Sequence, residues 1–98
     1  MTIDKNFQDE KLTVKVSGRL DTTTAPELES SLKESVDSID ELVLDLSDLE
    51  YISSAGLRVL LATQKVMNKQ GGMKVTGVND VIMEIFEVTG FSDILTIE

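Results

Sequence analysis

Hydrophobic and polar residues alternate near the start of the chain. Leu12, Val14 and Val16 share one parity with polar residues between them, which predicts a strand with one buried face and one face toward water. A weaker alternation covers residues 2–7, and a short acidic stretch separates the two segments. The pattern therefore predicts an antiparallel hairpin.

The next segment carries the signals of a helix start. Thr24 and Glu27 match a capping box, in which a threonine side chain and a glutamate three residues later pair with free backbone N–H groups. An early proline fits the first turn of a helix. Apolar residues then recur every four positions, which predicts an amphipathic helix over residues 25–37. These apolar residues are Leu28, Leu32 and Val36.

The middle of the chain predicts a central strand followed by a long helix. Residues 41–46 are apolar on both parities, which is typical of a strand covered on both faces. Residues 54–69 are rich in helix formers and contain no proline. Gly71 and Gly72 follow and supply a helix end where a positive φ costs little.

The last third repeats the order of strand and helix. Residues 73–76 alternate as a short strand, and a helix is expected between a cap at Asn79 and a stop at Gly90. Residues 94–97 are a candidate edge strand. The order β-β-α-β-α-β-α over residues 1–98 predicts one small α/β domain, with a mixed, mostly parallel sheet of four to five strands and three or more helices.

The predicted helix 54–69 has two apolar stripes, so two neighbours must cover it. One stripe must face the sheet, and the other either packs on the third helix or stays partly exposed as a docking patch for a partner. Basic residues between the stripes either form a solvated face or meet acidic groups on a partner. The first stripe is Leu57, Leu60, Leu61 and Met67, the second is Val59, Ala62 and Val66, and the basic residues are Arg58, Lys65 and Lys69.

Charge and composition narrow the classes of function. Nine basic and eighteen acidic residues give a net charge of −9, which disfavours direct binding to nucleic acid. The chain has no Cys and no His, so it lacks the usual nucleophilic triads and zinc ligands. Its acidic clusters lack the spacing of a calcium loop, so no metal is expected. Short apolar runs and the absence of a leader pattern predict a cytoplasmic protein that does not enter a membrane.

The junction between the predicted central strand and the long helix holds the candidate chemistry. In open parallel sheets, sites gather beyond the carboxyl ends of the strands, where helix N-termini present free N–H groups and a partial positive charge. Ser53 and Ser54 stand at this junction. Ser53 is expected to cap the helix and Ser54 to be its first residue. A phosphate there would face the favourable end of the helix dipole.

Three stretches carry a resemblance to a known family. Residues 18–26 read Gly-Arg-Leu-Asp-Thr-Thr-Thr-Ala-Pro, residues 54–57 read Ser-Ala-Gly-Leu, and a Gly-Gly pair at 71–72 is followed by Ile-Phe-Glu-Val-Thr-Gly-Phe at 85–91. In this order and spacing, they resemble the bacterial anti-sigma factor antagonists, the single-domain form of the STAS fold. The first stretch matches the loop into the first helix, the second the phosphorylation motif and the third the C-terminal third.

The resemblance implies partner switching without catalysis or a cofactor. Unphosphorylated family members bind an anti-sigma factor that is also a serine kinase, and this partner then releases its sigma factor. The kinase phosphorylates the antagonist with ATP, and a serine phosphatase resets it. By this resemblance Ser54 is the phosphoacceptor. The implied docking surface consists of Asp21, Thr22, Thr23, Thr24, Ser53, Ala55, Gly56, Leu57 and Arg58.

The chain departs from the family pattern beside the serine, and alternatives stay open. Many members have Asp before the phosphorylated Ser and Ser or Thr after it, whereas this chain has Ser53 and Ala55. Ser53 is therefore a second candidate acceptor. Ala55 and Gly56 either lower the surface for a kinase or permit close helix–sheet packing. One alternative is a STAS adaptor docking on a phosphatase, sensor or transporter component without being a kinase substrate. Another is an anion- or nucleotide-binding module.

Overall fold

The predicted hairpin forms the first edge of the sheet. In the computed structural model, which describes residues 1–98, β1 (Thr2–Gln8) pairs antiparallel with β2 (Lys11–Leu20). Leu12, Val14 and Val16 are fully buried, as the alternation predicts. The hairpin turns at Asp9, which adopts a φ of 57°.

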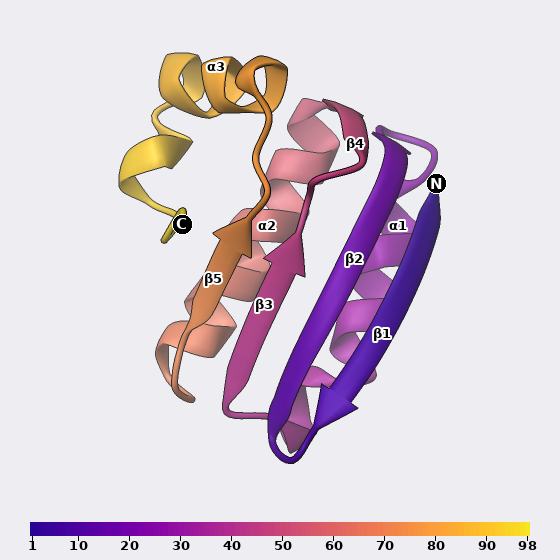
Figure 1. Ribbon diagram of the computed structural model, residues 1–98, viewed down its shortest axis with the longest axis vertical. Helices are drawn as coiled ribbons and strands as arrows, with labels where there is room; N and C mark the ends of the chain where they lie inside the picture. Colours follow the sequence, from indigo (N-terminus) through magenta and orange to yellow (C-terminus); the bar gives the residue numbers. More distant parts are fainter.

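Five strands form the mixed sheet, as expected (Figure 1). β3 (Glu41–Asp45) lies parallel between β2 and β5 (Met73–Thr76), so the prediction that it is central is confirmed. β4 (Leu49–Ile52) was absent from the expected order, and it pairs parallel with the end of β2, after a register shift between Gly18 and Arg19. Four residues buried only at their two ends carry no alternation, so sequence periodicity could not find this strand.

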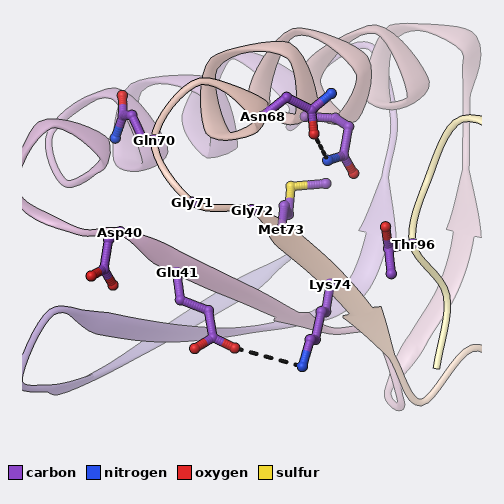
Figure 2. A pocket seen from close by; sticks show the side chains of 10 residues that line it. Asp40, Glu41, Asn68, Gln70, Gly71, Gly72, Met73, Lys74 and Thr96 are labelled. Carbon is purple, nitrogen blue, oxygen red and sulfur yellow. Dashed lines mark hydrogen bonds and ion pairs between the residues drawn. The ribbon is translucent and has the colours of Figure 1, made fainter.

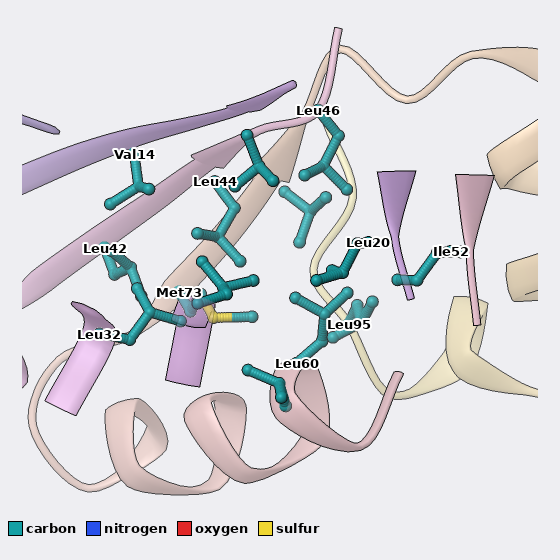
Figure 3. Close-up of a cluster of buried hydrophobic side chains, with 14 of the residues drawn as sticks. Val14, Leu20, Leu32, Leu42, Leu44, Leu46, Ile52, Leu60, Met73 and Leu95 are labelled. Carbon is teal, nitrogen blue, oxygen red and sulfur yellow. The ribbon is translucent and has the colours of Figure 1, made fainter. Parts of the chain in front are cut away.

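Two helices cover one face of the sheet, and the other face remains open (Figure 1). These are α1 (Ala25–Lys33) and α2 (Ser54–Asn68). Leu42 and Leu44 are fully buried in the layer between β3 and α2 (Figure 3). Val43 points the other way, is only half-buried, and lies between Thr13 and Lys74 of the neighbouring strands. The expectation that this strand is covered on both faces is therefore wrong, because polar residues of its neighbours share the open face.

The start and end of α1 also differ from the prediction. Thr24 makes no capping hydrogen bond to the helix, so the capping box does not form. Its Oγ1 instead accepts from the Asp21 backbone N–H at 2.8 Å and donates to the Arg19 carbonyl at 2.8 Å. The helix ends at Lys33 rather than at residue 37, and a separate 3₁₀ turn covers Val36–Ser38.

The second apolar stripe of α2 faces α1, and not the third helix. Val59, Ala62 and Val66 line a shallow groove with Val36 of the segment after α1. The third helix, α3 (Asp80–Thr89), packs against β4 instead. The three basic residues between the stripes are exposed, and the last of them is the C-cap of α2. These residues are Arg58, Lys65 and Lys69.

The predicted ends of α3 are confirmed. The Asn79 side chain accepts from the Ile82 N–H at 3.0 Å as the N-cap, and its amide donates to the Leu49 carbonyl at 2.8 Å. Gly90 ends the helix with a φ of 82°. The candidate edge strand 94–97 is reduced to one parallel bridge between Val75 and Ile97. No helix combines the length and apolar character needed to cross a membrane.

Candidate functional site

The N-terminal end of α2 has the arrangement that the sequence predicts. Ser53 is the N-cap, and its Oγ accepts from the Gly56 N–H at 3.4 Å. The Ser53 N–H donates to the Leu20 carbonyl at 2.9 Å, which ties the end of β4 to the end of β2. Ser54 is the first residue of the helix and is exposed. The Ser54 hydroxyl therefore lies at the surface, beyond the carboxyl ends of these strands.

The electrostatics of this helix end favour an added anion. The first N–H groups of a helix have no intrahelical partner, and they carry a partial positive charge. No acidic residue lies in the first turn of α2. Arg58, one turn along, is exposed on the same end of the helix. A negative group on Ser54 would therefore be attracted by the helix end, with no carboxylate in the same turn to repel it.

The loop before α1 is organised by Asp21. Its Oδ1 accepts from the Thr23 hydroxyl at 2.7 Å, from the Thr23 N–H at 3.0 Å and from the Thr24 N–H at 3.2 Å. The Thr23 hydroxyl is the main cause that lowers the pKa of Asp21 below its ordinary value of 3.8, and the two backbone N–H groups add to it. These bonds shape the loop around an ionised carboxylate and leave Thr22 and Thr23 exposed.

The loop and the first turns of α2 meet in one shallow depression of about 200 Å³. Thr22, Ala25 and Pro26 line it from the side of α1, and Ala55 and Arg58 line it from α2. The fold therefore brings together two segments that lie about thirty residues apart in the chain. Ser54 stands beside Ala55 at the edge of this depression.

Two residues of the implied docking surface lie in the core. Gly56 and Leu57 are buried, so they offer no side chain to a partner. A Cβ on Gly56 would lie 2.7 Å from Leu20 Cγ and 2.9 Å from Ile52 Cγ1. Close packing of α2 on the sheet therefore explains this glycine. Ala55, which is half-buried in the depression, is the small residue that keeps the surface low.

Arg19 joins this surface, and sequence reasoning missed it. The Arg19 guanidinium lies 4.4 Å from the centre of the Tyr51 ring, and its Nε is 3.9 Å from Asp21 Oδ2. Arg19 and Tyr51 are opposite each other in the β2–β4 pairing. Without β4, no signal in the sequence connects these two residues.

The lining of the depression indicates what kind of ligand it suits. Nowhere in the structure do three or more acidic side chains gather to hold a metal ion. The depression is shallow, and its lining combines one threonine hydroxyl, one carboxylate, one arginine and four apolar side chains. These residues are Thr22, Glu29, Arg58, Ala25, Pro26, Ala55 and Val59. Such a surface suits the docking of another protein better than the enclosure of a small molecule.

Comparison with known proteins identifies similar chains over nearly the full length. A protein-family model described as "Mlab, STAS domain" matches residues 3–96. The anti-sigma-B factor antagonist of Staphylococcus aureus is 34% identical over 97 residues, which cover 97% of this chain and 90% of that protein. The protein of the same name from Bacillus subtilis is 30% identical over 98 residues, covering 99% of this chain and 90% of that one.

A solved structure agrees with both the sequence and the fold. The crystal structure of an anti-sigma factor antagonist from Mycobacterium paratuberculosis superposes with a TM-score of 0.89 at 33% sequence identity. The match covers 98% of this chain and 83% of that one. The mixed sheet with helices on one face is therefore the fold of that antagonist as well.

Proposed function

Since the chain belongs to the STAS domain family, among relatives that are anti-sigma factor antagonists, we propose that it is such an antagonist and works by partner switching. In its unphosphorylated form it binds an anti-sigma factor that is a serine kinase, and the sigma factor is released. The kinase transfers the γ-phosphoryl group of ATP to Ser54 Oγ, and the complex separates. A serine phosphatase removes the phosphate by hydrolysis and resets the cycle.

The exposed hydroxyl of Ser54 at the start of α2, beside the Asp21 loop, is the observation that carries this proposal. Ser53 is a poorer acceptor because its Oγ caps the helix and it is half-buried. A phosphate on Ser53 would remove that cap, whereas Ser54 makes no side-chain hydrogen bond that would be lost. This difference favours Ser54 as the phosphoacceptor.

The docking surface in this proposal consists of the Asp21 loop and the first turns of α2, which meet in the depression. Gly56 and Leu57 support it from below. The contacting residues are Asp21, Thr22, Thr23, Thr24, Ser53, Ser54, Ala55 and Arg58, and Arg19 and Tyr51 extend the surface.

The position of the phosphate indicates how much phosphorylation should weaken binding to the partner. A phosphoserine carries a charge of about −1.5 to −2 at neutral pH, and inside a docked interface it must be desolvated, which weakens binding unless the partner offers a paired cation. A loss of about 2.7 kcal/mol would weaken binding roughly a hundredfold. The fold itself should be spared, because the charge faces the favourable end of α2. The chain supplies the acceptor, and kinase and phosphatase supply the catalysis.

The test is to map phosphorylation in matched variants. The wild-type protein, Ser54→Ala and Ser53→Ala are incubated with ATP and an extract of the native host, and the intact mass of each is measured. We expect one added phosphate on the wild type and on Ser53→Ala, and none on Ser54→Ala. A phosphate retained in Ser54→Ala would overturn the acceptor assignment. Capture of an anti-sigma factor without any phosphorylation would support the adaptor alternative.

A further inference from the structure

A second concave region lies at the opposite end of α2. It is a cleft of about 590 Å³ where the last turns of α2 meet the first residues of β3 and β5 (Figure 2). Met73 is the one hydrophobic residue among those that line it. Gln64, which reaches the cleft, is ten residues from Ser54, or about 15 Å along the helix. The cleft is therefore separate from the proposed phosphorylation surface.

Gln64 lines the cleft with a side-chain oxygen that has no hydrogen-bond partner. The residue is 3% exposed, and its Oε1 is buried without any hydrogen-bond partner. Its Nε2 donates to Asn68 Oδ1 at 2.7 Å, which sets the orientation of the amide and leaves the oxygen as the free group. A buried acceptor without a donor destabilises the folded state, because the oxygen has lost its hydrogen bonds to water. Leu60 and Met67 lie on the same buried side of α2 and are apolar, so packing against the core does not explain why position 64 carries an amide side chain.

The charges around the cleft favour a cation. Asp40 and Glu41 contribute two carboxylates to its lining, and Lys74 is its one cationic side chain. Lys74 Nζ is already shared, at 3.7 Å from Glu41 and 3.7 Å from Glu98. The lining therefore offers an unpaired buried oxygen and an excess of negative charge, in a chain whose net charge is −9. A ligand with N–H donors and a positive charge would satisfy both features.

The rim of the cleft is held in place before any ligand binds. Gln70 Nε2 donates to the Val36 carbonyl at 2.6 Å and to the Ile39 carbonyl at 3.1 Å. A Cβ on Gly71 would collide with the backbone carbonyl of Asp40, so the turn after α2 lies directly against the chain entering β3. These contacts fix the rim, so the one movement that binding requires is a turn of the Gln64 amide that brings its buried oxygen to the cleft.

We propose that this cleft binds a small organic cation that carries N–H donors, an aliphatic ammonium or a guanidinium compound. One N–H donates to Gln64 Oε1, and the positive charge lies near the carboxylates of Asp40 and Glu41. The proposal does not depend on the proposed function, since it concerns different residues at the other end of α2.

The test uses 1,4-diaminobutane as the probe, followed by changes in the amide signals of the full chain in ¹H–¹⁵N NMR. We expect saturable shifts confined to residues around the cleft, and no such shifts with 1,4-butanediol, which has the same length but no charge. Sodium chloride at matched ionic strength controls for general screening of an acidic protein. Shifts spread over the whole acidic surface, or shifts that do not saturate, would overturn the proposal.

Three variants sharpen the result. Gln64→Leu removes the buried acceptor, and Glu41→Gln removes one carboxylate at a half-buried position, so each should weaken binding of the probe by about tenfold or more. Glu87→Gln removes an exposed carboxylate from α3 and should leave binding unchanged. Thermal unfolding verifies that each variant is folded. Equal binding by all three variants contradicts the proposal, as does a crystal soaked with the diamine that holds only an ordered water on Gln64 Oε1.

Discussion

The two ends of α2 differ in whether their polar groups have hydrogen-bond partners. At the N-terminal end, Ser53 caps the helix, the Asp21 carboxylate is satisfied by its own loop, and Ser54 stands free at a shallow surface. At the C-terminal end, the Gln64 oxygen is buried and unpartnered beside a polar cleft. A surface whose polar groups are satisfied can gain a charge without disturbing its packing. A cleft that contains an unpaired acceptor is instead stabilised when a ligand with a hydrogen-bond donor binds in it.

Each end also contains a glycine that close packing requires, and the two should differ in cost. At Gly71 an added Cβ meets the backbone of Asp40, which cannot move without shifting the start of β3. At Gly56 it meets the side chains of Leu20 and Ile52. We expect Gly71→Ala to lower the free energy of unfolding by at least about 3 kcal/mol and Gly56→Ala by about 1–2 kcal/mol.

Urea denaturation of both variants measures this difference. Gly90→Ala is a useful third variant, because nothing lies within 4 Å of an added Cβ there and only the positive φ of 82° opposes the substitution. If Gly56→Ala proved the more damaging of the first two, the view that the turn after α2 is the more rigid end would be wrong.

The next effect in size separates binding from folding at the N-terminal end. Ser54→Asp should weaken binding to the anti-sigma factor by at least about tenfold, since it places one charge in the proposed interface. Its melting temperature should be unchanged or slightly higher, because an acid in the first turn of α2 fills a position where the helix dipole favours it. Titration calorimetry and thermal unfolding measure the two quantities. A variant that unfolds contradicts the argument from the helix end.

Replacing each of the two serines should change the stability of the protein by a different amount, because the two side chains make different contacts. Ser53→Ala removes the cap of α2, although that bond is long at 3.4 Å, and should cost about 0.5–1 kcal/mol. Ser54→Ala removes no side-chain hydrogen bond and should stay within about 0.5 kcal/mol of the wild type. Chemical denaturation of both variants measures the free energy of unfolding. A larger loss of this free energy in Ser54→Ala than in Ser53→Ala would mean that Ser54 is the structural residue.

The smallest expected effect is the dependence of stability on pH through Asp21. The pKa of Asp21 is lowered in the folded state, so its contribution to stability is fully present above the ordinary value of 3.8. That contribution is lost as the pH falls below 3.8 through the lowered value. Thr23→Val removes the hydroxyl that is the main cause, and it should bring the pKa of Asp21 back toward 3.8. Carbon NMR titration of the carboxyl group measures the shift, and an unchanged titration refutes this cause.

Much of the fold could be predicted because its signals are local. The alternation at Leu12, Val14 and Val16, the serines at the start of α2 and the Asn79 cap each act within a few residues. Such preferences depend on backbone sterics and on nearby N–H groups, so they are readable before the chain folds. The position of Ser54 on an exposed helix start was predictable for the same reason.

Other features depended on neighbours that are distant in the chain. The four residues of β4 become a strand only because the end of β2 offers free backbone groups. Thr24 bonds to the Arg19 carbonyl and to the Asp21 N–H rather than capping α1, since the loop folds around the Asp21 carboxylate. Val43 is apolar, yet the strands beside it determine that its face stays open.

By itself, then, the sequence determined where the three helices and four of the five strands begin and which serine stands free, because these depend on preferences within a turn or two of the chain. Only the tertiary structure decided that the Asp21 loop lies beside α2, that Arg19 stacks on Tyr51, and that the Gln64 oxygen is buried without a partner. The physical reason is that burial and hydrogen-bond satisfaction belong to pairs of segments, and a pairing exists only once the chain has packed.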